Sequence, residues 1–375
     1  MMRKLIAVVM TINLSLLIIS PAEALTVPAS FKALANSPAL AKPGILVIDP
    51  ISQEEIFSSQ ADIPRAPASI LKLISTVTAI TAFGADKVFK TSLSATEDPK
   101  IFVLLGEYDP WLTTSALEAS KFHRALSTKL ISAISKSGAD LSGITIEFNG
   151  LFEKDITNLR TFYGKKVKFK RISKSDLQAN SALSPIAEIN SPPLSEIIGF
   201  TLLWSDNTLA DRLARNAADE LGFTRDSDGM NNAFQKTLGN LEVSAKGLTV
   251  KDGSGLSHDD RVSARTMAEL LWKIRIEPQF QPIYDGLPVA GKSGTLKKRF
   301  LKYGKSANGL IKAKTGWINT SVTMAGYVEV GNNEYIFAVI ANHVNPTEKS
   351  RDQARKTIDK MLATVAKPAE ESLVG

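Results

Sequence analysis

The sequence predicts an α/β fold of the α+β type, in which helices flank a five-stranded antiparallel sheet. Strand-like runs occur near both ends of the chain, at residues 44–49 and 55–58 and again at residues 309–317, 322–330 and 335–343. Turns at Pro50 and Gly331 join neighbouring runs, which indicates antiparallel hairpins. We expect helices over residues 68–84 and 348–366 to pack on this sheet, with the middle of the chain inserted between its two parts.

The length and hydrophobic content of the chain predict two domains, or one domain with a large insertion. The chain has 375 residues, of which 44% are hydrophobic. We assign residues 25–94 and 185–375 to the main domain, with a helical subdomain that begins near residue 195. Residues 95–184 form a reduced inserted accessory region, where the pattern predicts a helix over residues 115–137 and a strand over residues 143–148.

A basic run lies in the second half of this accessory region. It consists of Lys165, Lys166, Lys168, Lys170 and Arg171. Lysines protect the exposed edges of sheets from mispairing, so the run favours a solvated edge strand. Contact with an anionic wall polymer is the alternative interpretation.

The first 24 residues are typical of a cleaved signal peptide. Arg3 and Lys4 precede an apolar run over residues 5–19, and Ala22 and Ala24 supply small residues before a cut. The apolar run is shorter than the roughly 20 residues that a membrane-spanning helix needs. We therefore expect residues 1–24 to direct export, so that the protein acts outside the cytoplasm, in the periplasm or cell wall or as a secreted protein.

The composition argues against several classes of site. The chain has no cysteine, so neither a disulfide framework nor a thiolate zinc site is available. His123, His258 and His343 are widely scattered, which argues against a histidine metal centre or a Ser-His-Asp triad. We expect no metal and no cofactor. The net charge of +7 favours anionic surfaces in general; we expect no nucleic-acid partner, and the oligomeric state stays open.

A serine and a lysine stand three residues apart at the head of the helix expected over residues 68–84. Pro67 precedes this helix and Gly84 closes it. At this spacing Ser69 and Lys72 project from the same helix face, one turn apart. The amine of Lys72 is then within reach of a proton leaving Ser69, as a nucleophilic serine requires.

Two further polar clusters complete a recognisable set. Lys314-Thr315-Gly316 lies at the end of a predicted strand, where Gly316 lets a substrate approach the backbone. Ser205-Asp206-Asn207 lies on a tight connection between helices, where Asp206 can cap the second helix. The patterns S-x-x-K, S-D-N and K-T-G occur together in class A β-lactamases and penicillin-binding proteins. Here they occur in that order, each in a suitable context.

On these motifs the chain resembles the D-alanyl-D-alanine carboxypeptidases and endopeptidases, which belong to the low-molecular-mass class C penicillin-binding proteins. Other landmarks of that family cover most of the chain: Arg65-Ala66-Pro67-Ala68-Ser69, Asp109-Pro110-Trp111-Leu112, Ser191-Pro192-Pro193-Leu194, Asp252-Gly253-Ser254-Gly255-Leu256, Leu287-Pro288-Val289-Ala290-Gly291, Gly294-Thr295-Leu296 and Ala325-Gly326-Tyr327-Val328. The resemblance implies the penicillin-binding/serine DD-peptidase fold, with a shortened insertion. It also implies peptidoglycan stem peptides as substrates and β-lactam antibiotics as acylating inhibitors.

The resemblance assigns a role to each catalytic residue. Ser69 would attack the carbonyl of a D-alanyl amide to form an acyl-enzyme, with Lys72 as its general base. Ser205 would pass a proton toward the leaving amine. The turn at residues 252–256 is interpreted as structural.

The substrate-binding residues follow in the same way. Asn207 would hold a peptide carbonyl, while Lys314 and Thr315 would bind the terminal carboxylate beside Gly316. Backbone N–H groups of Ser69 and Trp317 would hold the oxyanion. Trp317 departs from the family pattern, which commonly has threonine here, and its bulk favours cleavage of internal cross-links or of another acyl-D-amino substrate.

Two alternatives to a DD-peptidase remain open from the sequence. A class A β-lactamase carries a deacylating glutamate in an E-x-x-L-N stretch between the last two motifs, and residues 208–313 contain no such stretch. A catalytically silent envelope scaffold that kept the fold is the second alternative. The intact Ser69, Lys72 and Lys314 argue against it, whereas Trp317 and the shortened insertion are compatible with it.

Overall fold

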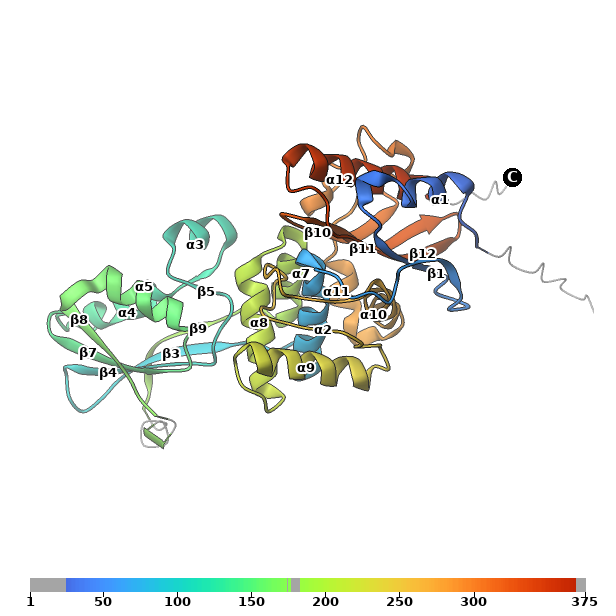
Figure 1. The fold of residues 1–375 in the computed structure, drawn as a ribbon. Coiled ribbons are helices and arrows are strands. Elements are labelled where there is room, and N and C mark those ends of the chain that lie inside the picture. Colours follow the sequence, from blue (N-terminus) through green and yellow to red (C-terminus); the bar gives the residue numbers. More distant parts are fainter. Residues whose placement is uncertain (1–24, 174, 177–182, 369–375) are drawn as a thin grey trace, which may run out of the picture.

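The structure is a computed structural model, and it describes residues 25–173, 175–176 and 183–368. The expected signal peptide at residues 1–24 lies outside these residues. The chain forms two parts, each built around its own sheet, which lie side by side in Figure 1. Within the described residues, no helix has the length and apolar character needed to cross a membrane.

The first sheet has five antiparallel strands, as the sequence predicts. Its order is β10 (Ile311–Ile318), β11 (Ser321–Val330), β12 (Asn333–Ala341), β1 (Gly44–Ile48) and β2 (Glu55–Ser59). The strand pairs of β10 with β11 and β11 with β12 are tight hairpins, and β1 joins them by pairing with β12. The two ends of the chain therefore meet in one sheet.

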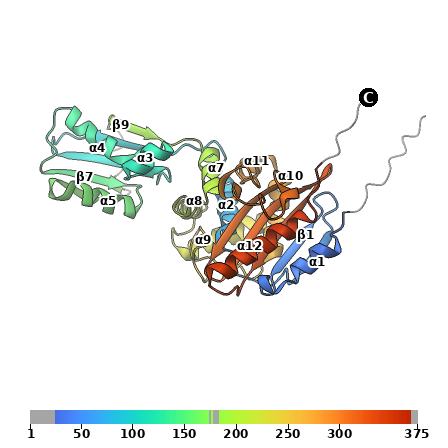
Figure 2. The same cartoon turned by 90° about the horizontal axis from the view of Figure 1, so that it is seen from above.

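Helices cover both faces of this sheet. On one face lie α1 (Ala29–Ala35) and α12 (Glu348–Ala363), which appear above the sheet in Figure 1 and across it in Figure 2. Their apolar side chains form a core with the sheet that includes Phe31, Ile358 and Leu362. The other face carries the helical subdomain, which consists of α2 (Lys72–Phe83), α7 (Leu194–Trp204), α8 (Asn207–Glu220), α9 (Ser227–Asn240), α10 (Ala264–Ile276) and α11 (Gln281–Asp285).

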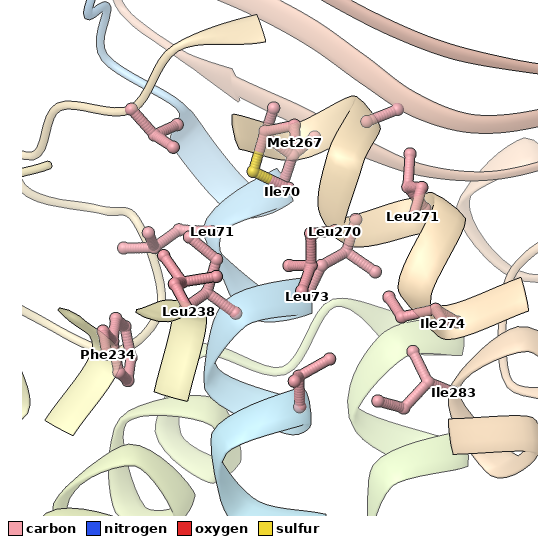
Figure 3. Close-up of a cluster of buried hydrophobic side chains, with 14 of the residues drawn as sticks. Ile70, Leu71, Leu73, Phe234, Leu238, Met267, Leu270, Leu271, Ile274 and Ile283 are labelled. Carbon is pink, nitrogen blue, oxygen red and sulfur yellow. The ribbon is translucent and has the colours of Figure 1, made fainter. Parts of the chain in front are cut away.

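Helix α2 runs through the centre of the helical subdomain. Figure 3 shows side chains of α2 and of the 3-10 turn before it, Ala68–Leu71, packed among those of α9, α10 and α11. The labelled residues are Ile70, Leu71, Leu73, Phe234, Leu238, Met267, Leu270, Leu271, Ile274 and Ile283. The predicted helix over residues 68–84 is confirmed, except that its first turn, Ala68–Leu71, is a 3-10 helix. Because α2 is buried on all sides, it is a rigid support for the residues at its N-terminus.

The second part is built on a mixed five-stranded sheet, at the left of Figure 1. Its order is β8 (Val167–Arg171), β7 (Ile144–Asn149), β4 (Ile101–Gly106), β3 (Lys90–Ala95) and β9 (Pro185–Asn190). The strands β4, β7 and β8 pair in parallel, while β3 pairs antiparallel with β4 and β9. The remaining elements are β5 (Leu112–Thr113), β6 (Ala125–Leu126), α3 (Ala116–Phe122), α4 (Ser127–Lys136) and α5 (Glu153–Tyr163).

The structure differs from two local expectations for this part. The single helix predicted over residues 115–137 is wrong, because His123 has φ 54° and separates α3 from α4. The second sheet reaches from Lys90 to Asn190, so it extends beyond the bounds 95–184 that the sequence suggests for the accessory region. The division into domains itself stays a prediction.

The chain enters and leaves the second part at one place. Ser191 N donates to Phe89 O at 2.8 Å, and Phe89 N donates to Ser191 Oγ at 2.9 Å. A second connection is a buried ion pair, in which Arg212 of α8 donates to Asp155 of α5 at 2.7 Å. Arg212 also donates to Leu112 O at 2.9 Å, and Asn216 of α8 donates to Tyr108 O at 2.8 Å. The second part is thus attached to the helical subdomain by more than the junction where the chain passes between them.

Most of the basic run lies on an edge strand, as the sequence favours, while Lys165 and Lys166 lie in the 3-10 turn Gly164–Lys166 before it. Lys168 and Lys170 of β8 are exposed, and β8 has a sheet neighbour on one side alone within the described residues. Two of its charges are paired, Lys170 with Glu147 and Arg171 with Glu153. Contact with an anionic wall polymer stays a prediction.

Candidate active site

The N-terminus of α2 is fixed against the first sheet by side chains of β11. Ser321 Oγ donates to Ala66 O and Thr323 Oγ1 donates to Pro67 O, each at 2.8 Å. Ala68, the residue before the expected nucleophile, has φ 49°, a left-handed conformation that is uncommon for a residue other than glycine. Such strained residues persist where the surrounding structure holds them, and they cluster at functional sites.

Ser69 and Lys72 are in direct contact, as their spacing predicts. Lys72 Nζ lies 2.8 Å from Ser69 Oγ, and it also donates to Asn207 Oδ1 at 2.7 Å and to Ser254 O at 2.8 Å. The amine of Lys72 is completely buried. Three acceptors therefore hold it beneath the serine hydroxyl.

The environment of Lys72 brings its amine close to neutrality. Burial lowers the pKa of Lys72 from 10.5 to about 7, against the opposing effects of the carboxylates of Asp252 and Asp206. Asp252 stays anionic, because hydrogen bonds from Ser254, Ser257 and Leu256 keep its pKa low although burial acts to raise it. A lysine with a pKa near 7 can accept a proton at neutral pH.

A second amine and hydroxyl pair faces the first. Lys314 Nζ on β10 lies 2.9 Å from Ser205 Oγ, in the connection between α7 and α8. Burial, followed by the charge of Lys72, lowers the pKa of Lys314 well below its ordinary value. Ser205 has φ 58°, and this left-handed turn directs the chain from α7 into α8. Asp206 caps α8 through Leu209 N at 2.9 Å, as expected.

These groups line a single cleft of about 770 Å³. All the predicted site residues either line it or bond directly to a residue that does: Ser69, Lys72, Ser205, Asn207, Lys314, Thr315, Gly316 and Trp317. Gly316 packs closely on the nucleophile, since a Cβ placed on it would lie 2.7 Å from Ser69 N. The backbone of β10 therefore runs beside the Ser69 N–H, where an oxyanion would be expected.

The sequence interpretation missed part of the site. The turn at residues 252–256 was expected to be structural, yet Ser254 O accepts a hydrogen bond from Lys72. The glycines of this turn were the available signal. Gly255 has φ 79°, and a Cβ there would lie 1.9 Å from Ala68 O. The turn therefore needs glycine in order to lie against the residue before the nucleophile.

Other cleft residues lie outside the three motifs, although Thr295 belongs to the landmark Gly294-Thr295-Leu296. Thr295 Oγ1 lies 2.8 Å from Thr315 Oγ1, and His258, Arg299, Asp352 and Arg355 also line the cleft. Within the described residues, no group of three or more histidine, aspartate and glutamate side chains is placed to bind a metal. The arrangement supplies a nucleophile, two amines and several hydrogen-bond donors, which suit acyl transfer.

Comparison with known proteins identifies the family. Residues 28–139 and 167–365 match the model of the D-Ala-D-Ala carboxypeptidase 3 (S13) family. The chain belongs to this family. The resemblance drawn from the motifs is thereby confirmed, and the S13 chain described here has the fold expected of it.

Sequence relatives of this S13 chain are named as carboxypeptidases. Carboxypeptidase DacB of Mycolicibacterium smegmatis is 34% identical over 185 residues, which are 48% of this chain and 39% of that protein. A carboxypeptidase of Mycobacterium tuberculosis is 23% identical over 381 residues, with 88% of this chain and 83% of the relative covered. The match to the M. smegmatis protein thus spans well under half of its length.

Solved structures share the fold of this S13 chain. Penicillin-binding protein 4 of Haemophilus influenzae superposes with a TM-score of 0.69 at 14% identity, covering 89% of this chain and 99% of that one. A predatory endopeptidase of Bdellovibrio bacteriovorus, acylated by penicillin G and bound to an immunity protein, has a TM-score of 0.64 at 18% identity and covers 88% and 94%. The penicillin-binding/serine DD-peptidase fold is therefore confirmed.

Proposed function

We propose that this chain is a serine DD-peptidase, which hydrolyses D-alanyl-D-alanine bonds or the D-alanyl cross-link bonds of peptidoglycan stem peptides. The contact between Ser69 and Lys72 carries the proposal. A buried amine with a pKa of about 7 lies 2.8 Å from a hydroxyl at the floor of an open cleft. Membership of the S13 family supports the same reaction.

Acylation follows from these positions. Neutral Lys72 accepts the proton of Ser69 as Oγ bonds to the D-alanyl carbonyl carbon, and the backbone N–H groups of Ser69 and Trp317 hold the oxyanion. The C–N bond then breaks. Ser205, which is bonded to Lys314, passes a proton to the departing amine and takes in return the proton that Lys72 received from Ser69, so Lys72 is neutral again before deacylation.

Deacylation regenerates the serine. Water attacks the Ser69 ester, its proton goes to the base, and the D-alanyl acid leaves as Ser69 Oγ recovers its proton. Asn207 Oδ1 already accepts from Lys72, so its amide nitrogen is available to a carbonyl of the bound peptide. Thr315 and Thr295 together offer hydroxyls to the carboxylate beside the leaving amine.

We also propose that the protein acts outside the cytoplasm. Peptidoglycan lies there, and the signal peptide expected at residues 1–24 would carry the chain to it. An antibiotic that acylates Ser69 would act on the protein at the same location.

The acyl-enzyme can be tested with fluorescent penicillin. The chain without residues 1–24 is incubated with the drug and followed by gel fluorescence and intact mass, beside Ser69→Ala. We expect a lasting adduct on the native chain and none on the variant. Rapid turnover of the drug would instead favour a β-lactamase, and a native chain without adduct would favour a silent scaffold.

The substrate is tested separately. Stem peptides with a free D-alanyl-D-alanine terminus and cross-linked peptide dimers are each incubated with the native chain, and the products are separated by chromatography. Release of D-alanine identifies carboxypeptidase action, and conversion of dimers to monomers identifies endopeptidase action. A native chain that is acylated by penicillin but cleaves neither peptide would contradict the proposed reaction.

A further inference from the structure

The catalytic cleft continues past Thr315 to the N-terminal half of α12. Arg299, Asp352 and Arg355 line this extension, together with Trp317. Arg299 follows the turn that carries Thr295, and Thr295 is bonded to Thr315 at 2.8 Å. The extension is therefore continuous with the hydroxyls at the predicted carboxylate position, although α12 contributes no residue to the sequence motifs.

The two arginines of this extension are neutralised to different degrees. Arg299 forms an ion pair with Asp359, a largely buried carboxylate, and donates to it through two of its nitrogens. Arg355 pairs with Asp352 at 3.6 Å, but Asp352 lies closer to Lys356, at 2.5 Å. The side chain of Arg355 is 30% exposed. Arg355 thus presents to the cleft a guanidinium that a further anion can approach.

Trp317 also lines the extension. Its side chain is 56% exposed, and Arg351 lies over its ring at 5.5 Å from the centroid. Arg351 is itself held by the carbonyls of Pro346 and Asn319, at 2.9 and 3.3 Å. The indole is consequently supported from the side of α12, where it can contact the apolar part of a bound chain.

The positions of the catalytic groups show which part of a substrate would reach this extension. The departing amine must lie near Ser205, which is bonded to Lys314, and the carboxylate next to that amine lies by Thr315. When the leaving group is a single D-alanine, it ends at this carboxylate and has only its methyl group besides, so it does not reach the extension. The leaving peptide of a cross-link continues, and it carries further carboxylates of its own.

We propose that Arg355, Arg299 and Trp317 form a subsite for the leaving peptide of a cross-linked substrate, with Arg355 binding a carboxylate of that peptide. The subsite rests on the proposed DD-peptidase function and specifies its substrate class as cross-linked peptides. Arg299 acts as a positioning residue, because its bonds to Asp359 and to Arg355 O, at 3.4 Å for the latter, fix α12 against the cleft.

Binding measured without turnover tests this subsite. Ser69→Ala protein is titrated calorimetrically with a D-alanyl peptide dimer, and with the same dimer whose leaving-peptide carboxylates are amidated. We expect Arg355→Ala to weaken binding of the acidic dimer roughly tenfold or more, since hydrogen bonds to charged groups are strong. Arg355→Ala should change binding of the amidated dimer by less than about twofold, because that dimer lacks the carboxylate that Arg355 would bind. The four affinities form a double-mutant cycle, which isolates the interaction between Arg355 and this carboxylate.

Lys360→Ala is the matched control. It removes a positive charge from an exposed position of α12 that does not line the cleft, so both dimers should bind as before. Arg355→Ala overturns the subsite if it leaves the affinity for the acidic dimer unchanged, or weakens both dimers equally. Penicillin acylation of the Arg355→Ala chain with Ser69 intact shows that the variant is folded, and the same assay on the native chain tests the DD-peptidase function independently.

Discussion

Lys314 Nζ lies 2.9 Å from Ser205 Oγ, although the two residues are 109 positions apart in the chain. One comes from an edge strand of the first sheet and the other from the helical subdomain, so the hydrogen bond crosses the cleft. Each residue alone is unremarkable in the sequence. In the reaction proposed above, their contact supplies the proton path for the departing amine.

Removal of the Ser205 hydroxyl should interrupt this path. We expect Ser205→Ala to lower kcat for peptide cleavage by about 10²–10⁴, the usual contribution of general acid catalysis. Steady-state kinetics with a D-alanyl peptide measure the effect. Ser306→Ala is the control, since that exposed serine also begins an S-x-N triplet, Ser306-Ala307-Asn308, but donates to Ala363 O and does not line the cleft. Equal kcat values for the two variants would contradict the path.

The depressed pKa of Lys72 predicts a pH dependence for acylation. A base must be neutral to accept the serine proton, and burial has lowered the pKa of Lys72 to about 7. Acylation by penicillin should therefore rise about tenfold per pH unit below pH 7 and level off above it. Stopped-flow acylation rates between pH 5 and pH 9 measure the profile. A rate that kept rising to pH 9 would show that the amine keeps an ordinary lysine pKa.

Gly255 should be required for the position of Ser69. An added Cβ would lie 1.9 Å from Ala68 O, so Gly255→Ala must displace either the turn or the residue before the nucleophile. We expect a loss of stability above 1 kcal/mol and acylation slowed at least tenfold. Gly84 has a similar positive φ, but a Cβ added there would meet no other atom within 4 Å, so Gly84→Ala is the control. That control should cost about 1–3 kcal/mol for its conformation and leave acylation unchanged.

Shortening a buried side chain of α2 should test how strongly this central helix stabilises the fold that supports the site. Leu73 is fully buried among α9, α10 and α11, so Leu73→Ala should lower the free energy of unfolding by about 2–5 kcal/mol. Leu117 on α3 is 74% exposed, and Leu117→Ala should change it by less than about 0.5 kcal/mol. Urea denaturation measures both. A small effect at Leu73 would mean that the surrounding helices collapse into the space.

Much of the first sheet and of the motif set can be predicted from the sequence. Hairpins such as β11 and β12 are local, so their alternation and the turn at Gly331 suffice. The pairing of Ser69 with Lys72 is also local, because helical geometry places residues three apart on one face. The S-D-N and K-T-G triplets lie in the predicted loop and strand contexts.

The rest of the site depends on tertiary packing that no short pattern encodes. Arg355 occupies an ordinary polar position of an amphipathic helix, and only the packing of α12 beside β10 brings it to the cleft. The break at His123 likewise depends on a left-handed residue that periodicity does not reveal. Ser254 contributes a backbone carbonyl, which is independent of the side chain and therefore invisible in the sequence.

The contacts that join the second part to the helical subdomain have a mechanical consequence. A lobe tied to its neighbour at a single junction, such as Phe89 with Ser191, is free to swivel there. The buried bond of Asp155 with Arg212 opposes such rotation together with the bonds of Arg212 to Leu112 O and of Asn216 to Tyr108 O, and a buried pair of this kind is costly to break. Arg212 belongs to the same helix as Asn207, so the second part is held directly by a helix that carries a site residue. We therefore expect changes in the length of its outer loops to leave the position of the second part beside the active site unchanged.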